Sequence, residues 1–198
     1  MHPLPFSGGP VYAIVFWTTY ILWLVLESIG SRTKRSADPT KASDRGSFRL
    51  LMILLWLALG LAFALPFLLP RATILWHRTA LFFVGIALML AGLAFRFYAM
   101  SLLGRFFTYQ VAVHPGQTVI EAGPYRYIRH PSYTGALITL VGLGFALGNW
   151  AGLLALLGCM VPAYAYRISV EEAALTTALG EPYKQYARRT RRLLPFLI

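Results

Sequence analysis

Two polar segments hold most of the residues in this chain that are able to bind a charged ligand. Residues 123–135 read GPYRYIRHPSYTG, and residues 166–186 read YRISVEEAALTTALGEPYKQY. Their carboxylates, arginines, histidine and tyrosines offer both donors and acceptors to a ligand that carries both charges. Taken alone, the first segment is equally typical of a proline-containing turn at a membrane interface. The second is equally typical of a solvated helix start with an ion pair between Arg167 and Glu171.

The stretch between these segments is predicted to bring them together. Residues 131–166 carry no charge, and the sequence GNW at 148–150 indicates a turn near the middle. We therefore expect two short helices that form a hairpin and return the chain to the same membrane face. Ionisable residues that converge at a membrane indicate a functional site. The groups predicted to converge are Arg129, His130 and Tyr133 before the turn, and Arg167, Glu171 and Glu172 after it.

Composition places the chain in a membrane. It is 58% hydrophobic and 13% charged, with a mean hydropathy of +0.61, which is far too apolar for an ordinary soluble domain. Uncharged runs predict three further spans at about residues 11–28, 50–70 and 79–95. With the hairpin, the predicted fold class is all-α: a polytopic membrane helix bundle of about five transmembrane helices.

The distribution of basic residues predicts the orientation. The net charge is +11, but the basic residues lie in short segments between uncharged runs, which is typical of membrane flanks and not of a nucleic-acid-binding face. Six Lys or Arg lie in the first loop, four after the third span and six in the tail; the second loop has two and the hairpin turn none. The positive-inside rule therefore predicts an integral, multi-pass protein with an outside N-terminus and a cytoplasmic site.

The chain is predicted to form one domain over residues 1–198. Residues 1–100 are the three-helix N-terminal part, and residues 101–198 are the cofactor-binding part with the hairpin and an interfacial tail. From Arg167 onward, apolar residues at Ile168, Leu175 and Leu179 alternate with charged ones, which predicts an amphipathic helix at the interface. With no Cys or His cluster at ligand spacing, we expect no metal centre.

The order of these motifs resembles a known family. GPYRYIRHPSY, an apolar hairpin, RISVEE and then GEPYKQYARRTRRLLP resemble the isoprenylcysteine carboxyl methyltransferase family and the related phospholipid methyltransferases. The resemblance covers roughly residues 110–195, nearly half of the chain. It implies a membrane-embedded methyltransferase that uses S-adenosylmethionine as cofactor. The implied acceptor is the carboxylate of a prenylated cysteine, in a small molecule or a protein, or a similar lipidic compound that enters from the membrane lipids.

The resemblance also implies site residues. Arg167 corresponds to the position that contacts the substrate and is the implied catalytic residue, and Glu172 is grouped with it as substrate-binding. Many family members have His where this chain has Gln117, which predicts a weaker or mostly backbone contact there. The implied cofactor-binding residues are Gln110, Gln117, Thr118, Val119, Ile120, Tyr125, His130, Pro131, Ser132, Tyr133 and Glu171.

The chemistry of the acceptor leaves alternatives open. A carboxylate is already ionised at neutral pH, so its methylation requires no general base, and positioning dominates catalysis. Arg167 is able to hold such a carboxylate by a two-pronged contact, although an ion pair with Glu171 competes with that role. An amine acceptor, as in a phospholipid methyltransferase, must lose a proton and makes a basic group more important. Another isoprenoid lipid is a further candidate for the acceptor.

Two other classes of protein compete with the methyltransferase. Sterol-type reductases resemble this C-terminal region but bind NADPH, and they commonly continue the His-Pro-x-Tyr motif with Gly-Asp. This chain has Gly135 followed by Ala136, which favours the methyltransferase. The third class is a noncatalytic lipid-binding membrane protein that uses these motifs as interfacial anchors, and a failure to bind any nucleotide-like cofactor would support it.

Overall fold

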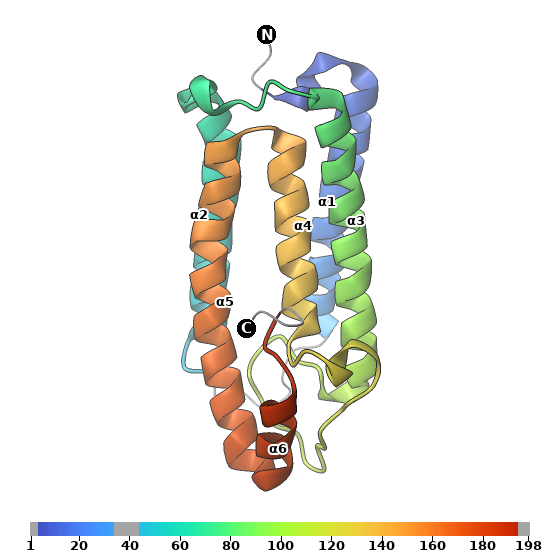
Figure 1. The fold of residues 1–198 in the computed structure, drawn as a ribbon, viewed down its shortest axis with the longest axis vertical. Helices are drawn as coiled ribbons and strands as arrows, with labels where there is room; N and C mark the ends of the chain where they lie inside the picture. Colours follow the sequence, from blue (N-terminus) through green and yellow to red (C-terminus); the bar gives the residue numbers. More distant parts are fainter. Residues whose placement is uncertain (1–3, 34–43, 194–198) are drawn as a thin grey trace.

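The computed structural model describes residues 4–33 and 44–193, which fold into long helices that run side by side (Figure 1). The α-helices are α1 Pro10–Thr33, α2 Ser47–Leu68, α3 Arg78–Leu103, α4 Pro131–Leu147, α5 Trp150–Leu179 and α6 Glu181–Arg189. Short 3-10 helices occur at Pro5–Gly8, Pro70–Ala72, Gly104–Phe106 and Gly123–Arg126. No strand occurs within the described ranges, and the predicted all-α class is confirmed.

The long helices have the length and composition of membrane spans. Among the described residues, α1, α2, α3 and α5 are long and apolar enough to cross a bilayer. The apolar helix α4 has 17 residues, or about 26 Å at about 1.5 Å per residue, slightly short of a core about 30 Å thick. Large side chains such as Ile14, Trp56 and Leu154 are exposed on the outside of the bundle. The predicted polytopic bundle is confirmed, with α4 as its short member.

Two of the long helices contain charged residues that pair with one another. Glu27 lies within the span predicted at 11–28, which continues to Thr33 as α1, and Arg96 lies one residue past the span predicted at 79–95, which continues to Leu103 as α3. Arg96 donates from Nε to Glu27 Oε1 at 2.5 Å and from Nη2 to Glu27 Oε2 at 3.0 Å. Ionisable residues within membrane helices face the bundle interior and pair in this way. The two charges therefore neutralise each other between α1 and α3.

Glycines let α3 and α4 pack backbone against backbone. A Cβ atom at Gly85 of α3 would lie 2.5 Å from the amide nitrogen of Ala146, and one at Gly92 would lie 2.6 Å from the carbonyl oxygen of Gly135. A Cβ atom at Gly142 would lie 2.6 Å from the carbonyl oxygen of Gly85. Small residues permit this close approach in membrane helix pairs. The contact fixes the start of α4, where the His-Pro-x-Tyr motif lies, relative to α3.

The turn between α4 and α5 follows the sequence prediction. Gly148 ends α4 with a φ of 65°, a left-handed conformation that favours glycine. Asn149 then caps α5, because its Oδ1 accepts a hydrogen bond from the amide of Gly152 at 3.1 Å. The predicted hairpin is confirmed, and both arms reach the same end of the bundle (Figure 1).

The prediction of a separate interfacial helix from Arg167 onward is wrong. α5 is one helix from Trp150 to Leu179, so Arg167 and Glu171 lie on the continuation of the apolar hairpin arm. Pro162 lies inside α5 without ending it, and the helix stops before Gly180, whose φ is 63°. Charge alone therefore did not mark a helix boundary, because no residue before Gly180 breaks the helix.

The amphipathic helix of the tail is α6, which is shorter than expected. Tyr183 and Tyr186 are buried on one side of α6, whereas Lys184 and Arg188 are exposed on the other. α6 folds back beside the end of α5 that extends beyond the bundle (Figure 1). Its buried tyrosines therefore face the chain that connects α3 to α4.

Candidate active site

A cavity lies at the end of the bundle where α5 extends beyond α4. Its lining comes from residues 103–120, the 3-10 helix Gly123–Arg126, the start of α4, the end of α5 and the buried side of α6. Its volume is about 840 Å³ when the open solvent at its mouth is included. The structure places these predicted site residues in its lining: Gln110, Gln117, Thr118, Val119, Ile120, Tyr125, His130, Ser132, Tyr133, Arg167 and Glu171.

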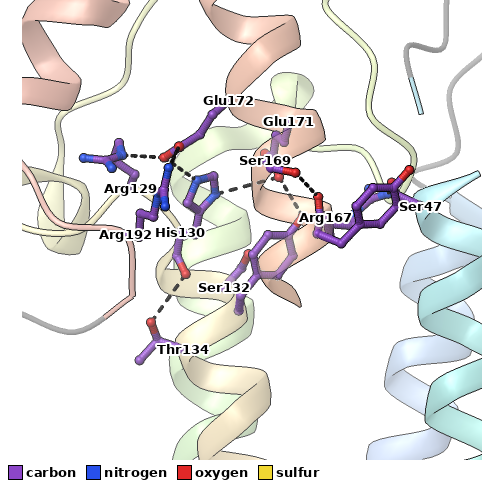
Figure 2. A network of polar contacts seen from close by, with 12 residues as sticks. Ser47, Arg129, His130, Ser132, Thr134, Arg167, Ser169, Glu171, Glu172 and Arg192 are labelled. Carbon is purple, nitrogen blue, oxygen red and sulfur yellow. Dashed lines mark hydrogen bonds and ion pairs between the residues drawn. The ribbon is translucent and has the colours of Figure 1, made fainter. Parts of the chain in front are cut away.

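Two predicted site residues do not line this cavity. Pro131 is the first residue of α4 and is buried, where its fixed φ suits the start of a helix. Glu172 instead accepts hydrogen bonds from Arg129 Nε at 2.7 Å and from Arg192 Nη2 at 3.0 Å, and it lies 3.4 Å from His130 Nε2 (Figure 2). Glu172 therefore joins the start of α4 to the chain after α6.

Tyr133 is the centre of the polar contacts inside the cavity. Its hydroxyl donates to Glu171 Oε2 at 2.7 Å and accepts from Arg167 Nε at 3.2 Å. His130 stacks on the Tyr133 ring, with 5.5 Å between the ring centroids, and its Nδ1 lies 3.7 Å from Glu171 Oε2. The hairpin thus brings together the two groups of side chains that the sequence predicted (Figure 2).

Arg167 pairs with a residue that the sequence analysis did not single out. Its side chain is 3% exposed, and its Nη1 donates to Asp44 Oδ1 at 2.5 Å and to Ser47 Oγ at 2.8 Å. Its Nη2 donates to the carbonyl oxygen of Tyr109. Glu171 is not its direct partner among the described residues, because Tyr133 lies between them. Arg167 therefore pairs with Asp44 in place of the expected ion pair with Glu171.

Asp44 is held by several donors at once. It accepts from the amides of Phe48 and Val111 at 3.0 and 3.1 Å, and from Ser47 Oγ at 3.1 Å. Burial alone would raise the pKa of Asp44, but the two amide hydrogen bonds and the charge of Arg167 lower the pKa below its ordinary value. The sequence DRGS before an apolar run signals a helix start, yet nothing in it identifies Arg167 as a partner.

The segment between α3 and α4 is held by its own side chains. Thr108 Oγ1 donates to the carbonyl oxygen of Gln110 at 2.7 Å, and Gln117 Oε1 accepts from the amide of His114 at 2.9 Å. Tyr186 of α6 donates to the carbonyl oxygen of Tyr125 at 2.8 Å. The side-chain oxygen of Gln117 is thus used within its own turn.

The buried hydroxyl of Tyr183 lies in the lining of this cavity. Tyr183 is 4% exposed, and its Oη has no hydrogen-bond partner among the described residues. Burial raises the pKa of the Tyr183 phenol, and burial followed by the negative charge of Glu171 raises the pKa of Tyr125. Both phenols therefore remain protonated donors at neutral pH. A buried polar group without a partner carries a desolvation cost that a bound ligand is able to relieve.

A second, largely apolar cavity lies inside the bundle beside the first. It encloses about 910 Å³ including open solvent. Glu27, Arg96 and Tyr109 are polar members of its lining, and the Tyr109 hydroxyl donates to Glu27 Oε2 at 3.1 Å. Tyr109 thus contacts this cavity with its side chain and Arg167 with its carbonyl oxygen. The lining residues from α1 and α2 are Trp23, Leu24, Glu27, Ser28, Ser31, Phe48, Leu51, Met52, Leu55 and Trp56.

Comparison with known proteins identifies relatives of the C-terminal half. Residues 85–177 match the model of the isoprenylcysteine carboxyl methyltransferase family. This range begins within α3 and includes the cavity-lining segment, the hairpin and the end of α5 that carries Arg167 and Glu171. It stops just before α6.

Curated proteins with isoprenylcysteine O-methyltransferase in their names are similar to half of this chain or slightly more. The chain is 32% identical to a probable protein-S-isoprenylcysteine O-methyltransferase of Oryza sativa subsp. indica over 117 residues, which are 58% of this chain and 61% of the relative. It is 32% identical to the protein-S-isoprenylcysteine O-methyltransferase of Schizosaccharomyces pombe over 101 residues, 50% of this chain and 43% of the relative. The chain thus spans about three fifths or less of these relatives. Its resemblance to the isoprenylcysteine carboxyl methyltransferase family is confirmed.

Proposed function

We propose that this protein is a membrane-embedded methyltransferase that uses S-adenosylmethionine to methylate the carboxylate of a prenylated cysteine or a similar lipidic acceptor. One observation carries the proposal: residues implied to bind the cofactor line one cavity together with Arg167, and an apolar cavity lies beside it. The names of the relatives, which are protein-S-isoprenylcysteine O-methyltransferases, support this acceptor.

The residues of the first cavity suit this cofactor. Glu171 is an acceptor for hydroxyl or ammonium groups, and the unpartnered Tyr183 hydroxyl is a buried donor for a carboxylate or ribose oxygen. Gln110 and residues 117–120 also line this cavity and bring further polar groups to it. These are the contacts that a ligand with a ribose, an adenine and a charged amino acid end requires.

When bound, S-adenosylmethionine supplies a methyl group on a sulfonium, so that an acceptor oxygen bonds to the methyl carbon while the carbon–sulfur bond breaks and its electron pair remains on sulfur. Arg167 holds the acceptor carboxylate at the boundary of the two cavities. Tyr133 fixes the Arg167 guanidinium by accepting from its Nε at 3.2 Å. No residue of the chain needs to remove a proton, because the carboxylate is already ionised.

The second cavity suits the lipid part of the acceptor. Its lining is mostly apolar, and the Glu27–Arg96 pair neutralises the charges within it. An isoprenoid chain that enters from the bilayer gains from contact with such a wall. With the chain in this cavity, Tyr109 lies between the lipid and Arg167.

Calorimetric titration of detergent-purified protein with S-adenosylmethionine and S-adenosylhomocysteine tests the cofactor. We expect both to bind, and Glu171→Gln to weaken both by about tenfold or more, since hydrogen bonds to charged groups contribute about 1.5–3 kcal/mol. Glu181→Gln is the matched control, because Glu181 is exposed on α6 and contacts Lys184 only at 3.9 Å. Equal losses in both variants would contradict a specific role for Glu171.

Methyl transfer to an N-acetylated, S-farnesylated cysteine tests the acceptor. We expect methylation of the free acid and none of its carboxamide, which lacks the reacting oxyanion. Methylation of phosphatidylethanolamine in the same assay would instead identify an amine acceptor. Binding of NADPH without either sulfur ligand would identify a reductase, and binding of none of the three by folded protein would exclude the enzyme proposed here.

A further inference from the structure

Arg167 has few N–H groups left for an acceptor. An arginine side chain carries five N–H donors. Its Nε donates to Tyr133 Oη at 3.2 Å, and its Nη1 donates to Asp44 Oδ1 at 2.5 Å and to Ser47 Oγ at 2.8 Å. Its Nη2 donates to the carbonyl oxygen of Tyr109. Within the described part of the chain, only one N–H, on Nη2, therefore has no acceptor.

Asp44 keeps Arg167 in this arrangement. The Asp44 carboxylate is fixed by the amides of Phe48 at 3.0 Å and Val111 at 3.1 Å, so it is anchored independently of Arg167. Its negative charge also neutralises the guanidinium, which weakens the attraction of Arg167 for another carboxylate. The predicted two-pronged contact with the acceptor carboxylate would require Arg167 to release one of its present partners.

Binding of the acceptor carboxylate through one oxygen suits methyl transfer better than binding through both oxygens. A carboxylate bound through both oxygens has both stabilised by hydrogen bonds, which lowers the reactivity of each. A carboxylate bound through one oxygen presents the other as a free nucleophile. Tight binding of the ground state without equal binding of the transition state lowers kcat. A limited number of free N–H groups on Arg167 is thus an advantage for transfer.

Building on the proposed function, we propose that Asp44 is a positioning residue that restricts Arg167 to a one-pronged contact with the acceptor carboxylate. The second carboxylate oxygen then remains free to take the methyl group. Asp44 lies on the loop before α2, outside the range that matches the family model. The N-terminal part of the chain therefore contributes directly to the acceptor side of the site.

The steady-state kinetics of Asp44 variants test this role. In Asp44→Ala, Arg167 gains a free N–H on Nη1 and an unneutralised charge. The KM for N-acetyl-S-farnesylcysteine should fall about threefold or more while kcat falls about tenfold, a pattern expected when ground-state binding strengthens at the expense of reaction. Asp44→Asn keeps one acceptor oxygen but removes the charge, and its changes should lie between those of wild type and Asp44→Ala.

The controls separate positioning from structural damage. Thr177→Ala alters an exposed hydroxyl on the same helix as Arg167 and should leave both constants unchanged. Loss of kcat with an unchanged or higher KM, or no loss of kcat, would overturn the proposal. If thermal melting shows that Asp44→Ala is unfolded, Asp44→Asn decides, because its amide retains hydrogen-bonding capacity at the start of α2.

Calorimetry on the same samples distinguishes this inference from the proposed function. If wild type binds no S-adenosylmethionine, the proposed function fails. If wild type binds the cofactor but neither binds nor methylates the farnesylated cysteine, the carboxylate acceptor fails and this inference fails with it. If wild type methylates the probe and the Asp44 variants bind the cofactor normally without a lower KM, only the role of Asp44 is wrong.

Discussion

Two buried arginines on either side of Tyr109 show how differently the two cavities use charge. Arg96 lies in the apolar cavity, is 7% exposed, and gives Glu27 a two-pronged contact, with a further bond to the carbonyl oxygen of Ser132 at 3.1 Å. Arg167 lines the first cavity and donates to Asp44, Ser47, Tyr109 and Tyr133. Arg96 thus gives two donors to one carboxylate, whereas Arg167 donates to four different residues and keeps one N–H without an acceptor among the described residues.

This difference indicates different roles. A two-pronged pair inside an apolar wall removes charge from that wall and joins α1 to α3. Replacing such a pair by apolar residues is often neutral for stability, whereas removing one partner leaves an unpaired buried charge. An arginine held by several separate contacts keeps a fixed position and remains able to bind a further group. We therefore expect stability to depend on Arg96 and activity on Arg167.

The largest effect is expected from Arg167→Ala, which should reduce kcat/KM for a prenylated cysteine by about a thousandfold. Loss of a hydrogen-bonded buried charge costs about 2–5 kcal/mol, and under the proposed function the lost contacts include the one to the acceptor. Arg167→Lys should recover little, because an ammonium lacks the planar donor geometry. Methyl-transfer kinetics measure this effect. Near-normal activity of either variant would show that Arg167 does not contact the acceptor.

The next largest effect is expected on the stability of the protein when Arg96 is replaced. Arg96→Met should lower the free energy of unfolding by about 3 kcal/mol, because the partly buried Glu27 then loses its cationic partner. The double variant Glu27→Leu with Arg96→Met should recover most of that loss. Thermal melting in detergent, followed by methyl-transfer assays, measures both quantities. A double variant that is stable but inactive would mean that the Glu27–Arg96 pair takes part in the reaction.

Replacing Tyr183 is expected to have two smaller effects of opposite sign: a gain in stability and a loss of affinity for the cofactor. Tyr183→Phe removes a buried hydroxyl that has no partner in the described residues, so the ligand-free protein should gain about 1 kcal/mol of stability. Its affinity for S-adenosylmethionine should fall about fivefold, since a hydrogen bond of about 1 kcal/mol is lost. Tyr186→Phe is the contrast, because the Tyr186 hydroxyl donates to Tyr125 and its loss should cost stability. Unchanged cofactor affinity in Tyr183→Phe would remove Tyr183 from the site.

The smallest effect is a pH dependence of stability from Asp44. Its pKa is lower in the folded protein than its ordinary value, so Asp44 stabilises the fold above the unfolded-state pKa, near about 4. This stabilisation is lost as pH falls through the lower, folded-state pKa. The difference in melting temperature between wild type and Asp44→Asn should therefore shrink as pH falls from 6 toward 3. A difference that does not vary with pH would show that the charge of Asp44 is unimportant for folding.

Local signals in the sequence predicted the hairpin and much of the site. Gly148 forms the turn through its left-handed backbone conformation, and Asn149 through its side-chain hydrogen bond at the start of α5. The motif around His130 directly adjoins the start of α4. Asp44 was missed because its contact with Arg167 joins residues far apart in the chain and depends on how α2 packs on α5. The length of α5 was missed because charge was taken as a boundary.

The second cavity also constrains the path of a lipid into the protein. Toward the far end of the bundle, Phe63 of α2 stacks on Trp17 of α1 with 6.1 Å between ring centroids and meets Tyr20 at 5.4 Å. The α3–α4 seam is closed by its glycine contacts. Nearer the site, α1 and α2 instead line the cavity together. Under the proposed function, an isoprenoid chain in this cavity would therefore contact the site-proximal halves of α1 and α2, with its carboxylate end toward Arg167.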